Sequence, residues 1–194
     1  MNNNWSDQDL IKSSLAGDDQ AIKNLLNRYL KAVYNFVFQY VGDTARAEDL
    51  TQEVMIKVWK NLAKYNLERP FKPWLFKIAR NQVLDSFKAK QMLNFSELEG
   101  GDEKGNVVED IPDSVDLPDE LLVKKELIEV IDRVLGTLAV RERLVIQLYY
   151  FNDLNLREIS EVLGQSINTV KSRLKRSLEK ISAELHQIMH DYRI

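Results

Sequence analysis

Apolar residues recur along this chain at spacings of three and four, which is the pattern of a helix with one buried face. The clearest case lies between residues 19 and 40, where the apolar face would consist of Leu25, Leu26, Tyr29, Val33, Phe36, Val37 and Tyr40. Between residues 5 and 90 no segment shows the alternation of a strand. The pattern therefore predicts an all-α protein.

Capping residues divide the first half of the pattern into separate helices. Ser6 and Asp9 have the spacing of a capping box, and Thr44 is predicted to cap a later helix. Pro73 suits the first turn of a helix, where its missing N–H is not needed. A loop over residues 64–72 precedes it. The four helices expected here span residues 6–16, 19–40, 44–62 and 73–90.

The second half predicts four more helices, over residues 121–137, 140–151, 156–163 and 166–181. Between the halves, residues 91–120 hold ten acidic residues and one basic residue, Lys104, for a net charge of −9. Because the whole chain has a net charge of −3, the rest of it is positive. This composition predicts an acidic flexible linker. A solvated spacer is its simplest interpretation, and mimicry of nucleic acid in a basic channel is the alternative. The two predicted domains therefore span residues 8–90 and 121–183.

Composition excludes several classes of site. The chain has no cysteine, so disulfides, thiolate zinc sites and cysteine nucleophiles are excluded. Its two histidines, His186 and His190, lack the intervening glutamate of a zincin motif, so neither a metal nor another cofactor is expected. No apolar signal segment or membrane span is evident, and the expected location is the cytoplasm.

A helix-turn-helix is predicted over residues 156–181. Gly164 can end the first helix with a positive φ, and Ser166 can cap the second. The second helix has a predicted buried stripe of Val170, Leu174, Leu178 and Ile181. Its opposite side carries Asn168, Thr169, Ser172 and Arg176, flanked by Lys171, Arg173 and Lys175. Such a helix fits the DNA major groove, where Arg176 suits guanine, Asn168 suits adenine and the flanking cations suit phosphates.

The third helix has a polar stripe opposite its apolar side. Leu50, Val54, Val58 and Trp59 are predicted to face inward, whereas the outward stripe consists of Asp49, Gln52, Glu53 and Lys57. Taken alone, such a stripe is typical of a solvated surface.

Residues 71–88 interleave aromatic and basic side chains, a mixture that proteins use to hold unstacked bases. Burial in the core is the simpler interpretation of Trp74, Phe76 and Phe87. Tyr65 and Phe71 are predicted to lie in the loop, where burial explains them less easily.

Three segments together resemble the extracytoplasmic-function (ECF) sigma factors of the bacterial sigma-70 family. They are AEDLTQEVMIKVWKNL at residues 47–62, FKPWLFKIARNQVLDSFK at 71–88 and LREISEVLGQSINTVKSRLKRSLEKI at 156–181. The resemblance implies a non-enzymatic subunit that binds core RNA polymerase through the β′ coiled coil and the β subunit. It would direct promoter-specific initiation by reading the −35 and −10 elements and helping to open the DNA. Members are often held by an anti-sigma factor, and family linkers pass through polymerase channels.

The resemblance also assigns residues to each role. The N-terminal domain would be sigma region 2 and the C-terminal domain region 4. Core polymerase would bind Asp49, Gln52, Glu53 and Lys57. The −10 element would contact Tyr65, Asn66, Phe71, Lys77, Arg80, Asn81 and Lys88. The −35 element would contact Asn168, Thr169, Lys171, Ser172, Arg173, Lys175 and Arg176.

Two other functions are compatible with parts of the sequence. A repressor or activator would use the same helix-turn-helix and usually dimerise, but no dimerisation helix or ligand pocket stands out. An enzyme acting on nucleic acid would need a carboxylate metal motif, a glycine-rich phosphate loop or a catalytic base, none of which is recognisable.

Overall fold

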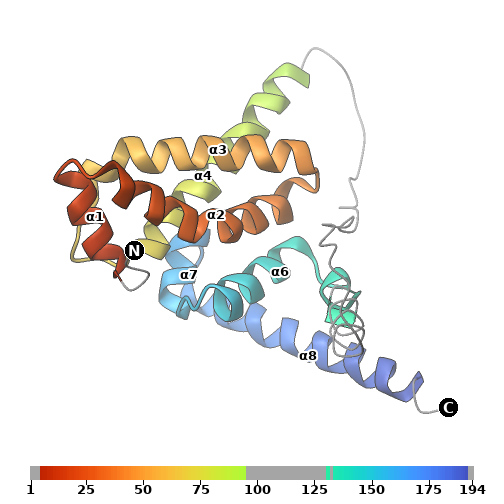
Figure 1. The fold of residues 1–194 in the computed structure, drawn as a ribbon. Coiled ribbons are helices and arrows are strands. Elements are labelled where there is room, and N and C mark those ends of the chain that lie inside the picture. The colour runs from red at the N-terminus through yellow and green to blue at the C-terminus, as the bar shows by residue number, and fades with distance from the viewer. Residues whose placement is uncertain (1–4, 95–129, 132, 192–194) are drawn as a thin grey trace, which may run out of the picture.

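The computed structural model of the protein describes residues 5–94, 130–131 and 133–191, and only the backbone at 88–94, 189 and 191. All regular elements in these residues are helices, as the hydrophobic pattern predicts (Figure 1). The N-terminal domain contains α1 (Asp7–Leu15), α2 (Asp19–Val41), α3 (Thr44–Asn61), the 3-10 turn η1 (Leu62–Lys64) and α4 (Phe71–Asn94).

In the C-terminal domain, the described residues 130–131 and 133–136 are helical. The domain continues with α6 (Val140–Ile146), its π-helical extension η2 (Gln147–Phe151), α7 (Leu156–Leu163) and α8 (Ile167–Asp191). Most of the predicted linker, from residue 95 onward, and the first part of the helix predicted at 121–137 lie outside the described residues.

Side-chain caps set the starts of the N-terminal helices. The predicted capping box is confirmed, since the Ser6 hydroxyl accepts the Asp9 N–H at 3.2 Å and the Asp9 carboxylate accepts the Ser6 N–H at 3.1 Å. The cap predicted at Thr44 is wrong, because the carboxylate of Asp43 accepts the Arg46 N–H at 2.7 Å. Asp43 has the extended backbone of an N-cap residue, so Thr44 becomes the first helical residue.

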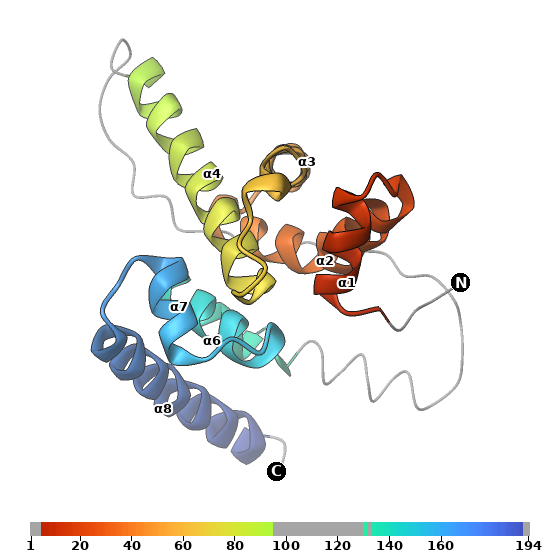
Figure 2. The ribbon, with the colours of Figure 1, turned by 90° about the vertical axis from the view of Figure 1, so that its left-hand side faces the viewer.

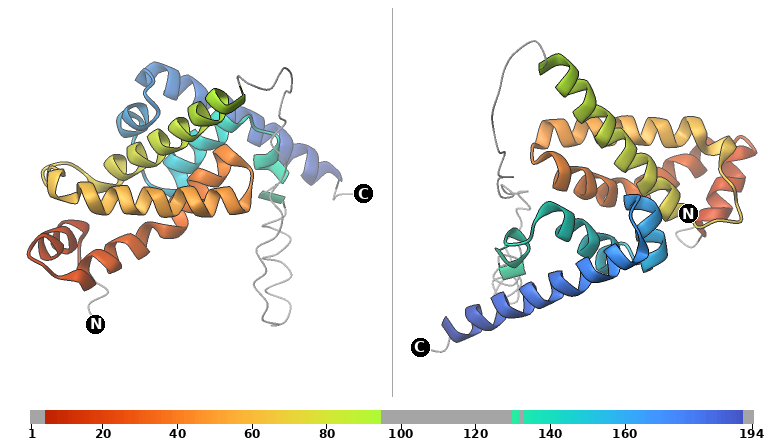
Figure 3. Two further views of the ribbon diagram at one scale, coloured as in Figure 1. Left: turned by 90° about the horizontal axis from the view of Figure 1, so that it is seen from above. Right: turned by 180° about the vertical axis from the view of Figure 1, so that it is seen from behind.

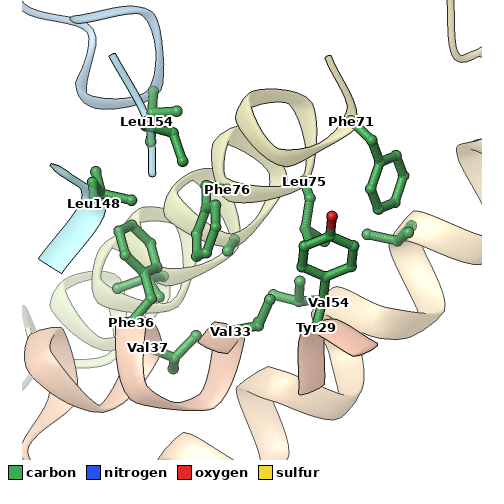
Figure 4. Packing of buried hydrophobic residues seen from close by; sticks show 14 of the residues in the cluster. Tyr29, Val33, Phe36, Val37, Val54, Phe71, Leu75, Phe76, Leu148 and Leu154 are labelled. Atoms are coloured by element: carbon green, nitrogen blue, oxygen red, sulfur yellow. The ribbon is translucent and has the colours of Figure 1, made fainter. Parts of the chain in front are cut away.

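The core of the N-terminal domain is formed where α2, α3 and α4 pack together (Figure 4). Five residues of the predicted α2 face are buried, and Leu26 and Tyr40 are half-buried. Phe36 and Phe76 are completely buried and meet edge to face, with ring centroids 5.2 Å apart. Burial of each such side chain contributes roughly 1.5–3 kcal/mol to the stability of the folded protein.

The buried stripe of α8 differs from the prediction at one position. Val170 and Leu174 are buried and Ile181 is half-buried, but Leu178 is 38% exposed and Ser177 is buried in its place. At about 100° per residue, Ser177 lies roughly 20° from Val170 around the helix, whereas Leu178 lies roughly 80° away. The Ser177 hydroxyl donates to the Arg173 carbonyl at 2.9 Å, which satisfies it without another partner.

The two domains pack directly against each other. Helix α4 contacts α7, and α2 contacts α6; Figure 2 shows α6 and α7 below the helices of the N-terminal domain. Leu148 and Leu154 of the C-terminal domain belong to the same buried cluster as Phe36 and Phe76 (Figure 4). A single apolar core therefore continues from one domain into the other.

Candidate nucleic-acid and polymerase interfaces

The predicted helix-turn-helix is confirmed in its geometry. Helix α7 begins with a capping box in which the Asn155 side chain accepts the Glu158 N–H at 3.0 Å. It ends at Gly164, whose φ of 61° is left-handed. The Ser166 hydroxyl then accepts the Thr169 N–H at 3.1 Å at the start of α8. A three-residue turn, residues 164–166, thus joins the two helices.

Helix α8 presents most of the predicted DNA-contacting side chains to solvent. Asn168, Lys171, Ser172, Lys175 and Arg176 are exposed, whereas Thr169 and Arg173 are half-buried. Figure 3 shows α8 as one continuous helix that extends beyond the body of the domain.

Two of the seven side chains on α8 already have partners in the turn. The Thr169 hydroxyl lies 2.8 Å from the Ser166 hydroxyl, and the Arg173 guanidinium donates to the Gln165 side chain. Arg176 donates from Nε to the Ser172 carbonyl one turn back, at 3.3 Å. The turn therefore orients Thr169 and Arg173, whereas the hydrogen bond of Arg176 lies within α8.

The stripe predicted on α3 is exposed along its whole length, at Asp49, Gln52, Glu53 and Lys57. Glu53 accepts a hydrogen bond from the Gln82 side chain of α4, which fixes its position.

Two large apolar residues of α3 also reach the surface. Trp59 is 58% exposed, so its predicted inward orientation is wrong. It follows the buried Val58 and is rotated about 100° from it around the helix. Ile56 is 49% exposed. The predicted stripe did not include it, although its place between Glu53 and Lys57 indicated an exposed position.

The loop before α4 is built around a cluster of four aromatic rings: Tyr29, Tyr65, Phe71 and Trp74, with centroids 5.0–5.6 Å apart. Tyr65 is 7% and Phe71 is 4% exposed, so the expectation that burial would not explain them is wrong. Phe71 is the first residue of α4, and the Tyr65 hydroxyl donates to the Arg69 carbonyl. Burial raises the pKa of the Tyr65 hydroxyl.

The remaining residues predicted to contact the −10 element differ from one another in solvent exposure. Lys77, Asn81 and Asn66 are exposed, and the Asn66 side chain accepts the Glu68 N–H at 2.9 Å in the loop. Arg80 is half-buried. The side chain of Lys88 lies outside the described residues. Phe76 is a core residue as predicted, whereas Trp74 and Phe87 are half-buried.

Arg80 and Lys72 of α4 face the C-terminal domain. A Cβ placed on Gly164 would lie 3.4 Å from the Arg80 guanidinium. The Lys72 ammonium donates to the Asn152 carbonyl at 3.2 Å and lies 3.4 Å from the Asp153 carboxylate. Sequence reasoning missed Lys72, because its partners are about eighty residues away and no local pattern marks them.

Metal sites and membrane spans are absent from the part of the chain that the structure describes. There, no cluster of histidine and carboxylate side chains could hold a metal ion. Nor does any described helix combine the length and apolar character needed to cross a membrane.

The fold and the helix-turn-helix define a two-domain, all-helical DNA-binding protein. The sigma-70 region 2 family model matches residues 25–92, and the sigma-70 region 4 model matches residues 128–181. The ECF RNA polymerase sigma factor SigW of Bacillus subtilis is 29% identical over 180 residues, covering 92% of this chain and 96% of SigW. SigL of Mycobacterium tuberculosis is 26% identical with the same coverage. The chain belongs to the ECF sigma factors of the sigma-70 family and directs promoter-specific transcription initiation with core RNA polymerase.

Two solved structures have a similar fold. CnrH, solved with the cytosolic domain of CnrY, has a TM-score of 0.60 at 23% identity and covers 93% of this chain and 97% of its own. RpoE of Bartonella quintana, solved with the anti-sigma factor NepR, has a TM-score of 0.65 at 21% identity and covers 84% and 96%. Both similarities support the two-domain helical fold.

Proposed function

We propose that three separate surfaces of this chain divide the work of initiation. The domain at residues 8–90 binds core polymerase and the −10 element, and the domain at 121–183 reads the −35 element. The observation that carries this division is the capped helix-turn-helix with an exposed polar side on α8, joined in one chain to a region 2 domain. The sigma-70 family is one of initiation subunits, and we propose that the chain has no catalytic role and works in the cytoplasm.

The −35 element is read by the exposed side of α8. Arg176 and Asn168 are exposed and have the side chains that form paired hydrogen bonds with guanine and adenine. Ser172 lies between them on the same side. Lys171 and Lys175 bind phosphates, together with Arg173, and these contacts fix the register without reading sequence. Thr169, held by Ser166, sets the start of the helix against the DNA.

Core polymerase binds the exposed side of α3. The stripe Asp49, Gln52, Glu53 and Lys57 supplies charge, and Ile56 and Trp59 supply exposed apolar area beside it. Large aromatic side chains surrounded by polar groups often dominate the energy of protein interfaces. A role in binding polymerase explains why Trp59 is exposed to solvent although the core of the domain is well filled.

The −10 element is bound by α4 and the loop before it. Lys77 and Asn81 are exposed on α4, and Arg80 and Lys88 complete the proposed contacts on this helix. Asn66 lies in the loop, whose conformation is fixed underneath by the buried rings of Tyr65 and Phe71. A base flipped out of the duplex would be held here, and its contacts would offset an unpairing cost of a few kcal/mol.

The polymerase assignment is tested by reversing charge on the stripe. The double variant Asp49→Lys with Glu53→Lys should bind purified core polymerase about tenfold more weakly or worse, a loss of at least ~1.4 kcal/mol. Asp19→Lys with Glu161→Lys makes the same change of charge at exposed positions outside the three surfaces and should bind normally. Binding is measured by gel filtration and by fluorescence titration. Equal binding by the two double variants would refute the assignment.

An anti-sigma factor is the further partner that the family resemblance implies. RpoE of Bartonella quintana was solved with one. We propose that an antagonist of this class acts on this chain by covering the α3 stripe or α4.

A further inference from the structure

We propose that Gln8 of α1 is a positioning residue for −10 recognition, because its side chain holds the loop before α4 in one conformation. We call residues 65–70 the reading loop. The inference rests on the function proposed above, in which this loop binds a base of the −10 element. Helix α1 lies ahead of the segment that the region 2 family model matches, which begins at residue 25, so that model gives α1 no role.

The hydrogen bond from Gln8 reaches the middle of the reading loop. Its side-chain amide donates to the Leu67 carbonyl at 3.1 Å, across a separation of 59 residues in the chain. Leu67 is half-buried and packs against the core, whereas Asn66 beside it, a proposed −10 contact, is exposed. Because one planar peptide bond joins the two residues, a displaced Leu67 would move Asn66 with it.

The rest of the reading loop is stabilised at its ends and from within. Tyr65 and Phe71 are buried at the two ends. The Tyr65 hydroxyl donates to the Arg69 carbonyl, and the Arg69 N–H donates to the Asn66 carbonyl at 3.1 Å. A cleft of about 320 Å³ lies beside the loop, and its lining includes Gln8, Arg69 and Phe71. Packing therefore leaves this side of the loop open, and the Gln8 bond joins the loop to α1 there.

Helix α1 is itself fixed well enough to act as a support. Its apolar side is buried in the core of the domain. The Asp7 carboxylate accepts hydrogen bonds from the Arg28 guanidinium, at 2.6 Å, and from the Tyr29 hydroxyl. Burial and the bond to Asp7 raise the pKa of Tyr29, so this hydroxyl stays protonated and donates at neutral pH. The first turn of α1, which carries Gln8, is therefore attached to α2.

This support matters because an ordered loop binds DNA without first losing conformational freedom. The Gln8 bond is exposed, so water competes with it, and its removal should hardly change the stability of the fold. Its removal should instead let the reading loop adopt other conformations and so weaken base selection.

The test removes the Gln8 amide at nearly constant size and without a change of charge. The Gln8→Met chain is assembled with core polymerase. Its binding is measured to single-stranded oligonucleotides that carry the −10 sequence selected with the unmodified chain, or single-base changes of it. Preference for the selected sequence should fall roughly three- to tenfold, whereas binding to core and to the −35 duplex should stay normal. Gln8→Lys, whose ammonium can again donate to the Leu67 carbonyl, should recover part of the preference.

The matched control is Gln20→Met on α2. Gln20 is also exposed, and its side-chain amide donates to the Asn24 side chain at 3.0 Å, a bond that does not involve the reading loop. This variant should keep the full −10 preference. Equal preferences of the Gln8→Met and Gln20→Met chains would overturn the inference alone. An equal loss on the −35 duplex would also overturn it, because general damage affects both elements. If the unmodified chain with core binds all −10 oligonucleotides equally, the proposed function fails, and the inference with it.

Discussion

The two domains hold their functional side chains in place by different physical means. The N-terminal domain uses long helices, 23 residues in α2 and 24 in α4, whose apolar sides fill a common core. The C-terminal domain carries its proposed DNA contacts on α8, which has 25 residues, but supports this helix with α7, which has only 8 residues. An isolated helix of that length is marginal in water. Its two ends are fixed instead by the Asn155–Glu158 capping box and by the left-handed Gly164.

This difference follows from what each domain has to bind. A reading helix must approach the DNA groove closely, so the helix that supports it is short and its turn is tight. In the proposed division of roles, the N-terminal domain binds polymerase over an extended surface and needs a rigid support under it. Substitutions should therefore affect the N-terminal domain most through its core, and the C-terminal domain most through its turn and its exposed side chains.

The largest expected loss of stability comes from removing an aromatic ring from the core of the N-terminal domain. Phe76→Ala should destabilise the protein by about 3–5 kcal/mol, because Phe76 is completely buried against Phe36. Urea unfolding followed by circular dichroism measures this loss. Trp59→Ala, at a position 58% exposed, is the control and should change stability by less than about 0.5 kcal/mol. Equal losses would mean that the core assignment is wrong.

Removal of an exposed polar side chain on α8 should affect binding and leave stability intact. Arg176→Ala should cost about 1–3 kcal/mol on the cognate −35 element and relax specificity at one base position. Lys175→Ala, a proposed phosphate contact, should weaken binding evenly on all sequences and reduce its salt dependence. Fluorescence anisotropy with a set of singly substituted −35 duplexes separates the two patterns. A uniform loss for Arg176→Ala would make it a phosphate contact.

The turn of the helix-turn-helix should tolerate a side chain poorly. Gly164→Ala should destabilise the C-terminal domain by about 1–2 kcal/mol, because its φ of 61° is costly for residues with a Cβ. Gly136→Ala is the matched control, since its φ is not left-handed and a Cβ there would meet nothing within 4 Å. Thermal unfolding compares the two variants. A neutral Gly164→Ala would show that the turn does not constrain the fold.

The smallest expected effect concerns an ion pair within the C-terminal domain. The hydrogen bond from Lys180 lowers the pKa of Glu142 below its ordinary value of 4.5. A lowered pKa in the folded state means that the stabilisation is present above pH 4.5 and is lost as the pH falls through the folded value. Because Lys180 is 53% exposed, the contribution is under about 1 kcal/mol.

Glu142→Gln checks this assignment, because it removes the charge at nearly constant size. Urea unfolding is followed between pH 3 and 7 for the variant and the unmodified chain. The variant should lose part of the acid dependence of stability. An unchanged dependence would assign the acid sensitivity to other carboxylates.

The sequence correctly predicted most of the local secondary structure. Capping and periodicity identified the described helices, and the helix-turn-helix followed from Gly164 and Ser166. Errors arose where two candidates were close together: Asp43 against Thr44 as a cap, and Ser177 against Leu178 as a buried residue. In both cases a shift of one residue decides the outcome, which a pattern of apolar positions resolves poorly.

The sequence could not predict contacts between distant segments. Tyr65 and Phe71 are buried because Tyr29, far earlier in the chain, packs against Phe71. Periodicity reports which side of a helix is apolar, but not what lies against it. For the same reason the contact between Lys72 and Asp153 could be found only in the folded structure.

The central claim is that this chain gives core RNA polymerase its promoter preference. The most direct test mixes the purified chain with bacterial core polymerase lacking sigma and sequences the run-off transcripts from a library of promoter fragments. The account predicts a stable complex that initiates at a shared pair of −35 and −10 sequences. A chain that remains separate from polymerase yet shifts DNA by itself would contradict the account and indicate a repressor.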